Sequence, residues 1–597
     1  MPATRVTIVL NSQQSQKAPL LIPSSTSLDP ASSSSCQDLV IKTAQSKLRL
    51  KKANRIYVAG GRELKGKKDW EDVLKDDVVF LVSAGEEYVG SKKQEPLVIQ
   101  GQNQDDCRPS KEGNPNYTIN ILAEKAFIDS TSITQLETTA RSLPGIIHAV
   151  AQPDLHPGSK FPIGAVFVSE GWIHPPLIGG DIGCGMAWFK TKLSRSQVEG
   201  DKGRRIAERL QGLEGPWRNQ QDREIWLQTD MMEENAHSGA GAEWDAALGT
   251  IGAGNHFGEL QVVEESTPAH GIGSSRSQFQ LYEGEVVLLV HSGSRGYGGD
   301  ILKRYTADGQ TSLHESDPVA KHYLEEHNGA CNWASKNRDL IALRFLACLE
   351  PGGESWDLGR NNPDSTATAQ HILTARAAVQ SRKVVDIWHN NVELASWPPQ
   401  PPSPLSSNPE ADTSTSISTL TTSAPPPPNP HQSKAYIHRK GAAPTLNPST
   451  QTPLSILPLP GSRGTPTLIL HPTFTAHNAH GLTNALSLAH GAGRAMSRAK
   501  ASTYISNKYK GRAEDLLRGD FVPMDKQGNK LGGRDSGVGE DVMGGTWVVC
   551  EEKQLVWEEA AEAYKDVWAV GGDLVGRGCA ERWGWCRGRV SYKVRKG

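Results

Sequence analysis

The sequence predicts a mixed α+β protein that has a small N-terminal module, a polar linker and one long folded region. Three observations lead to this prediction. Strand-like and helix-like runs alternate within residues 1–90, residues 91–115 are polar, and apolar runs with glycine-rich loops fill residues 116–597. A chain of 597 residues is long enough to bury a large core and to hold more than one module.

The first ninety residues contain short apolar runs around one helical pattern. Strands are expected at Val6–Leu10, Pro19–Ile22, Arg55–Val58 and Val78–Val82, with a helix at Asp38–Leu48 between the second and third. This order resembles the β-grasp of ubiquitin-like domains. No chemistry-bearing motif is found here, so the module is expected to bind a partner or position the chain. An α+β appendage without a partner is the alternative.

Two segments read as connections. Residues 91–115 are rich in Gln, Asp, Asn and Gly and are interpreted as a linker. Residues 398–430 are dominated by Pro, Ser and Thr, a composition that cannot supply a packed core and is expected to be disordered. Because ordered motifs resume on both sides, this second segment is interpreted as an insertion within the long folded region.

Composition sets limits on location and partners. The formal net charge is −2, so any nucleic acid would have to bind a local basic cleft. The eight cysteines form no CxxC pair, and the N-terminus lacks a signal-peptide pattern. No apolar run approaches the ~20 residues that span a bilayer. We therefore expect a reduced, soluble protein without a membrane partner, cytoplasmic or nuclear.

Potential metal ligands occur in glycine-rich settings. Asp181 and Cys184 stand three residues apart in a glycine-rich turn, where a carboxylate and a thiolate can converge on one divalent ion. His256 lies between a flexible loop and an expected strand, His291 follows the apolar run VVLLV, and His389 follows an alanine-rich helical stretch. Each residue alone is more often structural. Together they form a plausible two-metal set that favours Mn, Fe, Co, Ni or Zn.

A second group of loops is suited to phosphate. Pro460–Thr465 offers backbone N–H groups, a hydroxyl and a guanidinium, and His490–Arg494 precedes an expected helix at Ala495–Ser502. A histidine at this point could attack phosphorus. The alternative is an ordinary glycine-rich turn that caps a helix. His438–Gly441 is a compact basic cluster, for which a solvated face is the common explanation.

Taken together, these motifs resemble the RtcB family of RNA ligases, from about residue 116 to Gly597, interrupted by the insertion. The matching runs keep the family's order. They are Pro153–Gly158, Asp181–Met186, Gly252–Glu259, His291–Gly296, Asn332–Arg338, His389-Asn390, His438–Ala442, Pro460–Thr465, His490–Arg498, Glu562–Val567 and Lys596-Gly597.

The resemblance implies a single αβ catalytic domain around a cleft that holds two Mn²⁺ ions. The implied metal ligands are Asp181, Cys184, His256, His291 and His389, with Cys184 bridging. The implied nucleophile is His490, which takes GMP from GTP. Guanylate contacts are expected from Asn255, Glu259, Ser462, His490, Gly491, Gly493, Tyr564 and Lys596, and RNA contacts from Arg439 and Lys440.

The implied reaction joins an RNA 3′-phosphate or 2′,3′-cyclic phosphate to a 5′-hydroxyl, in tRNA splicing or RNA repair. It passes through a guanylylated histidine and an RNA(3′)pp(5′)G end. Two alternatives remain at this point: an enzyme that mainly caps 3′-phosphate ends with GMP, and a catalytically silent RNA-binding or adaptor protein. Departures from the family pattern, such as Ser159 before Lys160 and Arg463 after Ser462, bear on substrate choice more than on the metal chemistry.

Overall fold

The structure is a computed structural model of the whole chain. It describes residues 3–88 apart from 12–16, 24, 30–31, 33–34, 59–61 and 75–77, and residues 117–594 apart from 211–212, 229–238, 268–279, 308, 351–353, 361–366, 401–432, 448–449 and 519–544. The expected linker at residues 91–115 and nearly all of the expected insertion at 398–430 lie outside these ranges. Contacts between Cα atoms divide the chain into two compact units, Met1–Pro109 and Ser110–Gly597.

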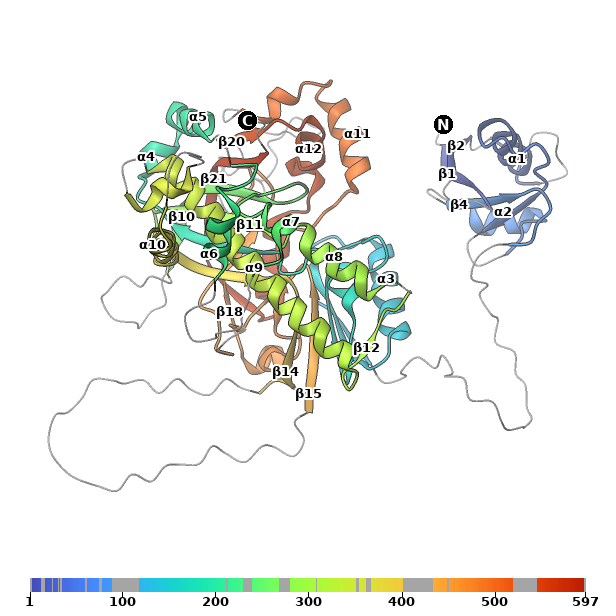
Figure 1. The fold of residues 1–597 in the computed structure, drawn as a ribbon. Helices are drawn as coiled ribbons and strands as arrows, with labels where there is room; N and C mark the ends of the chain where they lie inside the picture. The colour runs from blue at the N-terminus through green and yellow to red at the C-terminus, as the bar shows by residue number, and fades with distance from the viewer. Residues whose placement is uncertain are drawn as a thin grey trace. The chain divides into compact units, whose positions relative to one another are not determined.

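The first unit is a four-stranded sheet with helices (Figure 1). Its elements are β1 (Ala3–Leu10), β2 (Lys17–Pro23), α1 (Cys36–Lys47), β3 (Arg55–Val58), α2 (Lys67–Val73) and β4 (Val78–Ser83). The strand order is β2-β1-β4-β3, and the two central strands, β1 and β4, are parallel. The expected strands and helix are therefore present, whereas α2 was not anticipated, because its sequence is short and polar apart from the buried Trp70.

The second unit is built on two large sheets (Figure 1). The eight-stranded sheet has the order β13 (Lys383–Trp388), β9 (Gly185–Lys190), β11 (Val286–Ser292), β10 (Phe257–Ser266), β21 (Ala580–Val594), β18 (Thr467–Pro472) and β17 (Leu457–Pro460), with β20 (Trp547–Cys550) parallel to β21. The five-stranded sheet has the order β14 (Asn390–Trp397), β15 (Ser433–Lys440), β7 (Ile163–Ser169), β6 (Ile146–His156) and β5 (Thr118–Ile121). Two short pairs complete it: β12 (Leu313–His314) with β8 (Trp172–Ile173), and β16 (Ala442–Pro444) with β19 (Ser487–Ala489).

Helices cover these sheets. They are α3 (Ser130–Ser142), α4 (Arg195–Val198), α5 (Gly200–Arg209), α6 (Gln220–Leu227), α7 (Ala242–Asp245), α8 (Gly296–Tyr305), α9 (Pro318–Leu349), α10 (Ala369–Gln380), α11 (Arg498–Lys508), α12 (Lys553–Glu558) and α13 (Val567–Gly576). Short 3₁₀ turns lie at Pro175–Leu177, Glu354–Gly359, Ala476–Gly481, Ala513–Leu516 and Ala561–Ala563.

The longest helix, α9, carries the chain across the eight-stranded sheet (Figure 1). It begins where the Asp317 side chain accepts the backbone N–H of Val319 and Pro318 occupies the first turn. Its buried face, which includes Trp333 and Leu340, packs in one apolar cluster with residues of β11. This packing fixes α9 beneath the strand ends that carry the site. In the described part of the chain, no helix has the length and hydropathy needed to cross a membrane.

Candidate active site and metal centre

Strand register brings the sequence-predicted metal ligands together. Cys184 immediately precedes β9, His256 precedes β10, His291 lies in β11, and His389 connects β13 to β14. Because β13, β9, β11 and β10 are consecutive antiparallel neighbours in one sheet, these four positions lie side by side at the same end of their strands. The pairing is direct: His291 lies opposite Met186 on β9 and opposite Phe257 on β10.

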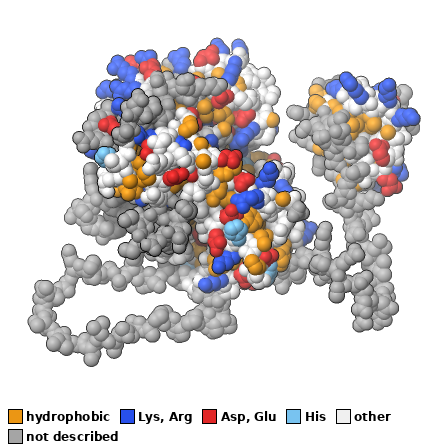
Figure 2. All heavy atoms as spheres, in the orientation of Figure 1, with side chains coloured by type: hydrophobic (Ala, Val, Ile, Leu, Met, Phe, Trp, Pro, Cys, Tyr) orange, Lys and Arg blue, Asp and Glu red, His pale blue; other side chains and the backbone are white. Residues whose placement is uncertain are grey.

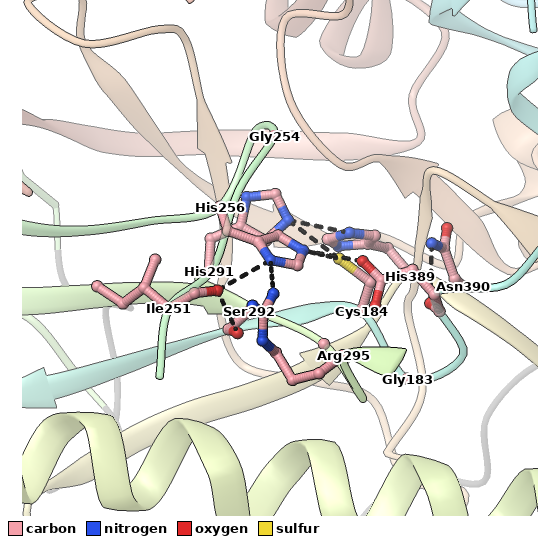
Figure 3. Close-up of polar contacts among 12 residues, drawn as sticks. Gly183, Cys184, Ile251, Gly254, His256, His291, Ser292, Arg295, His389 and Asn390 are labelled. Carbon is pink, nitrogen blue, oxygen red and sulfur yellow. Dashed lines mark hydrogen bonds and ion pairs between the residues drawn. The ribbon is translucent and has the colours of Figure 1, made fainter. Parts of the chain in front are cut away.

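The ligand atoms form a continuous cluster (Figure 3). The Sγ of Cys184 lies 3.3 Å from Nε2 of His256 and 3.3 Å from Nε2 of His291. The Nε2 atoms of His291 and His389 are also 3.3 Å apart, and Nε2 of His256 is 2.8 Å from Oδ2 of Asp181. The ligand atoms of Cys184, His256 and His291 all lie within 4.8 Å of one another, and Asp181 and His389 adjoin this group through His256 and His291.

The donor set fits divalent ions. Atoms that share one ion at bond lengths of about 2.0–2.3 Å lie roughly 3–3.7 Å from one another, as do the pairs at 3.3 Å around Cys184 and His291. Burial lowers the pKa of His291 and of His389 well below the usual range, which leaves both imidazoles neutral with a lone pair to donate. The buried Oδ1 of Asp181 and Nδ1 of His389 have no hydrogen-bond partner. The group of Cys184, His256 and His291 could hold a metal ion, with Asp181 and His389 beside it.

The thiol itself is protonated in the absence of an ion. Burial, reinforced by the charge of Asp181, raises the pKa of Cys184 well above its ordinary value. Because a thiolate is the form that ligates, binding a divalent ion at this position must release a proton.

Backbone contacts hold the ligand loops in place. Arg338, a fully buried residue of α9, donates from Nη1 to the carbonyl oxygens of Gly183 and Ser292, both at 2.9 Å, and from Nε to Asp386 at 2.7 Å. One guanidinium thus ties the turn before Cys184 to the strand of His291. At Gly293 a Cβ atom would lie 2.1 Å from Oδ1 of Asp181, so only glycine allows the approach.

His490 lies next to this cluster at the end of β19. Its ring centroid is 4.6 Å from that of His389, and its Nδ1 is 2.8 Å from Oδ2 of Asp154. Because Nδ1 faces this carboxylate, Nε2 is the ring nitrogen that remains for a substrate. His490 also lines a cavity of about 780 Å³. An imidazole that lines a cavity beside a cluster of expected metal ligands is suited to nucleophilic attack.

The cavity gathers the residues expected to contact guanylate. Its lining includes Asn255, Glu259, Ser462, His490, Gly491, Gly493 and Tyr564. Lys596 lies outside the described residues. Lys593, three residues earlier on β21, lines the cavity and donates to the carbonyl oxygen of Gly254 at 3.1 Å. Burial raises the pKa of Glu259 to about 7.

Glu559 was not anticipated, although it organises one wall of this cavity. Oε1 accepts from Arg494 at 3.1 Å, Oε2 accepts the hydroxyl of Tyr564, and Nζ of Lys593 lies 3.8 Å from Oε2. The carboxyl is almost fully buried. Glu559 precedes the matched run EAYKDV, and only the three-dimensional structure reveals that Arg494 and Lys593 converge on it.

Lys565 and Gly493 hold Asp154 in position. Nζ of Lys565 donates to the carbonyl oxygens of Pro153 and Leu155, at 3.1 and 2.6 Å, on either side of Asp154. A Cβ atom at Gly493 would lie 2.2 Å from the Asp154 carbonyl oxygen. Burial lowers the pKa of Lys565 to about 8. Neither Asp154 nor Lys565 was assigned a role from the sequence, although both occur in matched runs.

The expectation that Arg439 faces RNA phosphates is wrong. Its side chain is fully buried, donates to Glu393 at 2.9 Å and to the Ser487 hydroxyl at 2.7 Å, and so links β15, β14 and β19. A basic cluster in sequence does not reveal which side of its strand faces inward, and β15 is paired on both sides. Lys440 is half-buried, burial lowers its pKa, and it does not line the cavity.

Comparison with known proteins agrees with this geometry. The family model described as tRNA-splicing ligase RtcB matches residues 135–239, 213–356 and 428–518. The chain is 32% identical over 452 residues to the RNA-splicing ligase RtcB2 of Escherichia coli, covering 75% of this chain and 88% of that protein. It is 26% identical over 512 residues to the tRNA-splicing ligase RtcB of Thermococcus kodakarensis, covering 76% and 88%.

A eukaryotic relative extends the comparison. The RNA-splicing ligase RtcB homolog 1 of Entamoeba dispar is 25% identical over 503 residues, covering 74% of this chain and 77% of that protein. The family match spans the segments that carry Asp181, Cys184, His256, His291 and His490. With this match, and with nearly nine-tenths of the E. coli relative covered at 32% identity, the chain belongs to the RtcB family of RNA ligases.

Proposed function

We propose that this protein is a GTP- and manganese-dependent RNA ligase that joins a 3′-phosphate or 2′,3′-cyclic phosphate end to a 5′-hydroxyl end. The observation that carries the proposal is the position of His490. Its ring is 4.6 Å from that of His389, it lines the cavity, and Asp154 is 2.8 Å from its Nδ1. A metal-ligand cluster, a nucleophile and a nucleotide-sized cavity are therefore contiguous.

The protein's own groups have defined tasks in the first step. Nε2 of His490 forms a bond to the α-phosphorus of GTP, and the bond to the leaving pyrophosphate breaks. Asp154 retains the proton at Nδ1 and offsets the positive charge that develops on the ring. Glu259 accepts hydrogen bonds from the guanine edge, and Lys593 lies in the same lining.

The later steps use the same site. A 2′,3′-cyclic end is first opened by water, which breaks the bond between phosphorus and the 2′-oxygen and leaves a 3′-monophosphate. GMP then passes from His490 to the RNA 3′-phosphate, after which the 5′-hydroxyl attacks the activated phosphate and GMP leaves. Divalent ions, when held by Asp181, Cys184, His256, His291 and His389, would orient phosphate oxygens and offset their charge. Mn²⁺ is proposed over Mg²⁺ because thiolate and imidazole ligands disfavour Mg²⁺.

The first unit is proposed to be a β-grasp module that binds a protein partner. The support is its sheet order, β2-β1-β4-β3 with a central parallel pair, and the exposure of Leu21 on β2. We place the whole protein in the cytoplasm or nucleus, since a Cys184 that ligates metal must remain reduced.

Self-labelling tests the proposed reaction. Purified full-length protein would be incubated with Mn²⁺ and α-³²P-GTP, then denatured. We expect acid-labile, alkali-stable label on wild type and none on His490→Ala. His371→Ala removes an exposed histidine of α10, and it should label normally. Label on His490→Ala would show that another residue is the nucleophile. Labelled protein that caps RNA ends with GMP but never seals them would change the assignment to end-capping.

A further inference from the structure

An exposed aromatic ring stands at the opening of the catalytic cavity. Phe127 lies between β5 and α3, lines the cavity together with His490, and is 66% exposed, more than any other large hydrophobic side chain in the described ranges. It belongs to none of the buried apolar clusters of those ranges. A large ring left in water beside a reactive group is a feature of binding surfaces.

Cations line the same cavity. Arg498 and Lys500, both exposed, come from the first turn of α11, which the Ser497 side chain caps. Lys and Arg side chains stand out along the upper edge of the second unit in Figure 2, where Figure 1 places α11. Arg498 lies 3.8 Å from Glu559, whereas no carboxylate of the described residues is within ion-pair distance of Lys500.

The acidic residue nearest in sequence to Phe127 does not cancel this charge. The side chain of Asp129 accepts the backbone N–H of Thr131 at 2.7 Å and caps α3. Among the described residues, an ammonium without a carboxylate partner and a ring without an aromatic partner thus line one cavity. A cationic groove and exposed aromatic rings are the two components that bind single-stranded nucleic acid without sequence preference.

We propose that this opening binds a nucleotide of the single-stranded RNA end, with its base stacked on Phe127 and its phosphate held by Lys500. The inference rests on the proposed function, which brings an RNA end to His490. It adds that the enzyme grips unpaired RNA next to the reacting phosphate and tolerates any base there, because every base offers a π-face.

RNA binding measures the stacking contact. The probe is a short single-stranded RNA with a 3′-phosphate, added to full-length protein with Mn²⁺ and without GTP, and followed by fluorescence anisotropy. Phe127→Ala should raise Kd roughly five- to hundredfold, the loss expected for one stacked base, and Phe127→Trp should restore affinity. Val319→Ala, which trims a 45% exposed side chain outside the cavity lining, is the matched control. Equal Kd for wild type and Phe127→Ala would overturn the inference.

An abasic scan locates the base. RNAs that lack one base at each position near the 3′ end would be bound to wild type and to Phe127→Ala. At one position the loss of the base and the loss of the ring should not add, because each removes the same stack. Additive losses at every position would mean that Phe127 contacts no base.

Salt dependence tests Lys500. Lys500→Gln should reduce the slope of log Kd against log salt concentration by about 0.7, the value for one phosphate contact in a single strand. Lys321→Gln, an exposed lysine of α9 outside the lining, should leave the slope unchanged. An unchanged slope for Lys500→Gln would show that Lys500 does not contact an RNA phosphate.

Wild-type labelling by GTP alone separates this inference from the proposed function. If wild type takes label but substitution of Phe127 and Lys500 leaves its RNA affinity unchanged, only the proposed RNA site is contradicted. If wild type takes no label but its RNA affinity depends on both residues, the proposed RNA site stands and the guanylylation proposal is contradicted.

Discussion

The two units differ in what they bury. In the described part of the first unit, the buried polar side chains are Asn11, Ser35, Thr43 and Ser83, all of them neutral. The second unit buries charged and titratable groups by comparison, among them Asp154, Glu259, Arg338 and Glu559. Burial of a charge costs free energy unless the charge is paired. The first unit therefore depends on its apolar core, and the second carries an electrostatic cost that chemistry requires.

The largest expected effect on activity lies in the cluster of expected metal ligands, where bound divalent ions would compensate the charge of the thiolate and the carboxylate. Cys184→Ser removes the sulfur atom that contacts both His256 and His291, so bound Mn²⁺ and self-labelling should fall together, labelling by at least about a hundredfold. Elemental analysis and the GTP assay measure the two quantities. Cys348→Ser, on α9 away from the cluster, is the control. Full metal content in Cys184→Ser would show that the thiol is not a ligand.

Glu559 tests the opposite case, in which the protein compensates its own charge. Glu559→Gln leaves Lys593 and Arg494 buried beside a neutral amide, so the free energy of unfolding of the second unit should fall by about 3–5 kcal/mol. Urea denaturation measures it. Glu558→Gln, next in the chain and half-buried, should change stability by less than about 0.5 kcal/mol. A Glu559→Gln protein as stable as wild type would mean that the charge of Glu559 does not stabilise Lys593 and Arg494 in the folded protein.

Glu259 adds a pH dependence between about pH 5 and pH 8, whereas the shifted carboxyl groups of the first unit, such as Glu63 with its pKa lowered to about 2, titrate below this window. Burial raises its pKa from 4.5 to about 7, so between these values the folded state keeps a proton that the unfolded state has lost. The free energy of unfolding therefore falls as pH rises through this window, by up to about 3 kcal/mol. Glu259→Gln should match wild type near pH 5 and exceed it near pH 8. Thermal melts across this range check it, and parallel profiles would contradict it.

The sequence predicts elements and chemistry more readily than packing. The strand of His291 appears as the run VVLLV because a buried strand is apolar along its length, and it is observed as β11. The expected helix at Ala495–Ser502 is observed three residues later, because Ser497 serves as the cap of α11. The helix α2 was missed because it buries little besides Trp70.

Within the site, motif order located His490 and the expected metal ligands, which the structure brings together, but it did not locate their neighbours. Arg439 belongs to a basic run and is buried. Lys593 and Glu559 were given no role from the sequence, and both line the cavity. Their positions depend on the register of β21 and on the packing of α12, which are set by contacts between segments distant in the chain. The residues next to Lys593 and Glu559 in the sequence do not predict such long-range contacts.

The smallest expected effect lies in the first unit. The Ser35 hydroxyl accepts the backbone N–H of Asp38 and caps α1, so Ser35→Ala should lower the free energy of unfolding of this unit by about 1 kcal/mol. Because no charged group takes part, the loss should be the same near pH 5 and near pH 8. Ser46→Ala, in the last turn of α1, should cost less than about 0.5 kcal/mol. A loss that differs between pH 5 and pH 8 would mean that a group titrating within this window also supports the fold of the first unit, and the contrast in pH dependence between the two units would not hold.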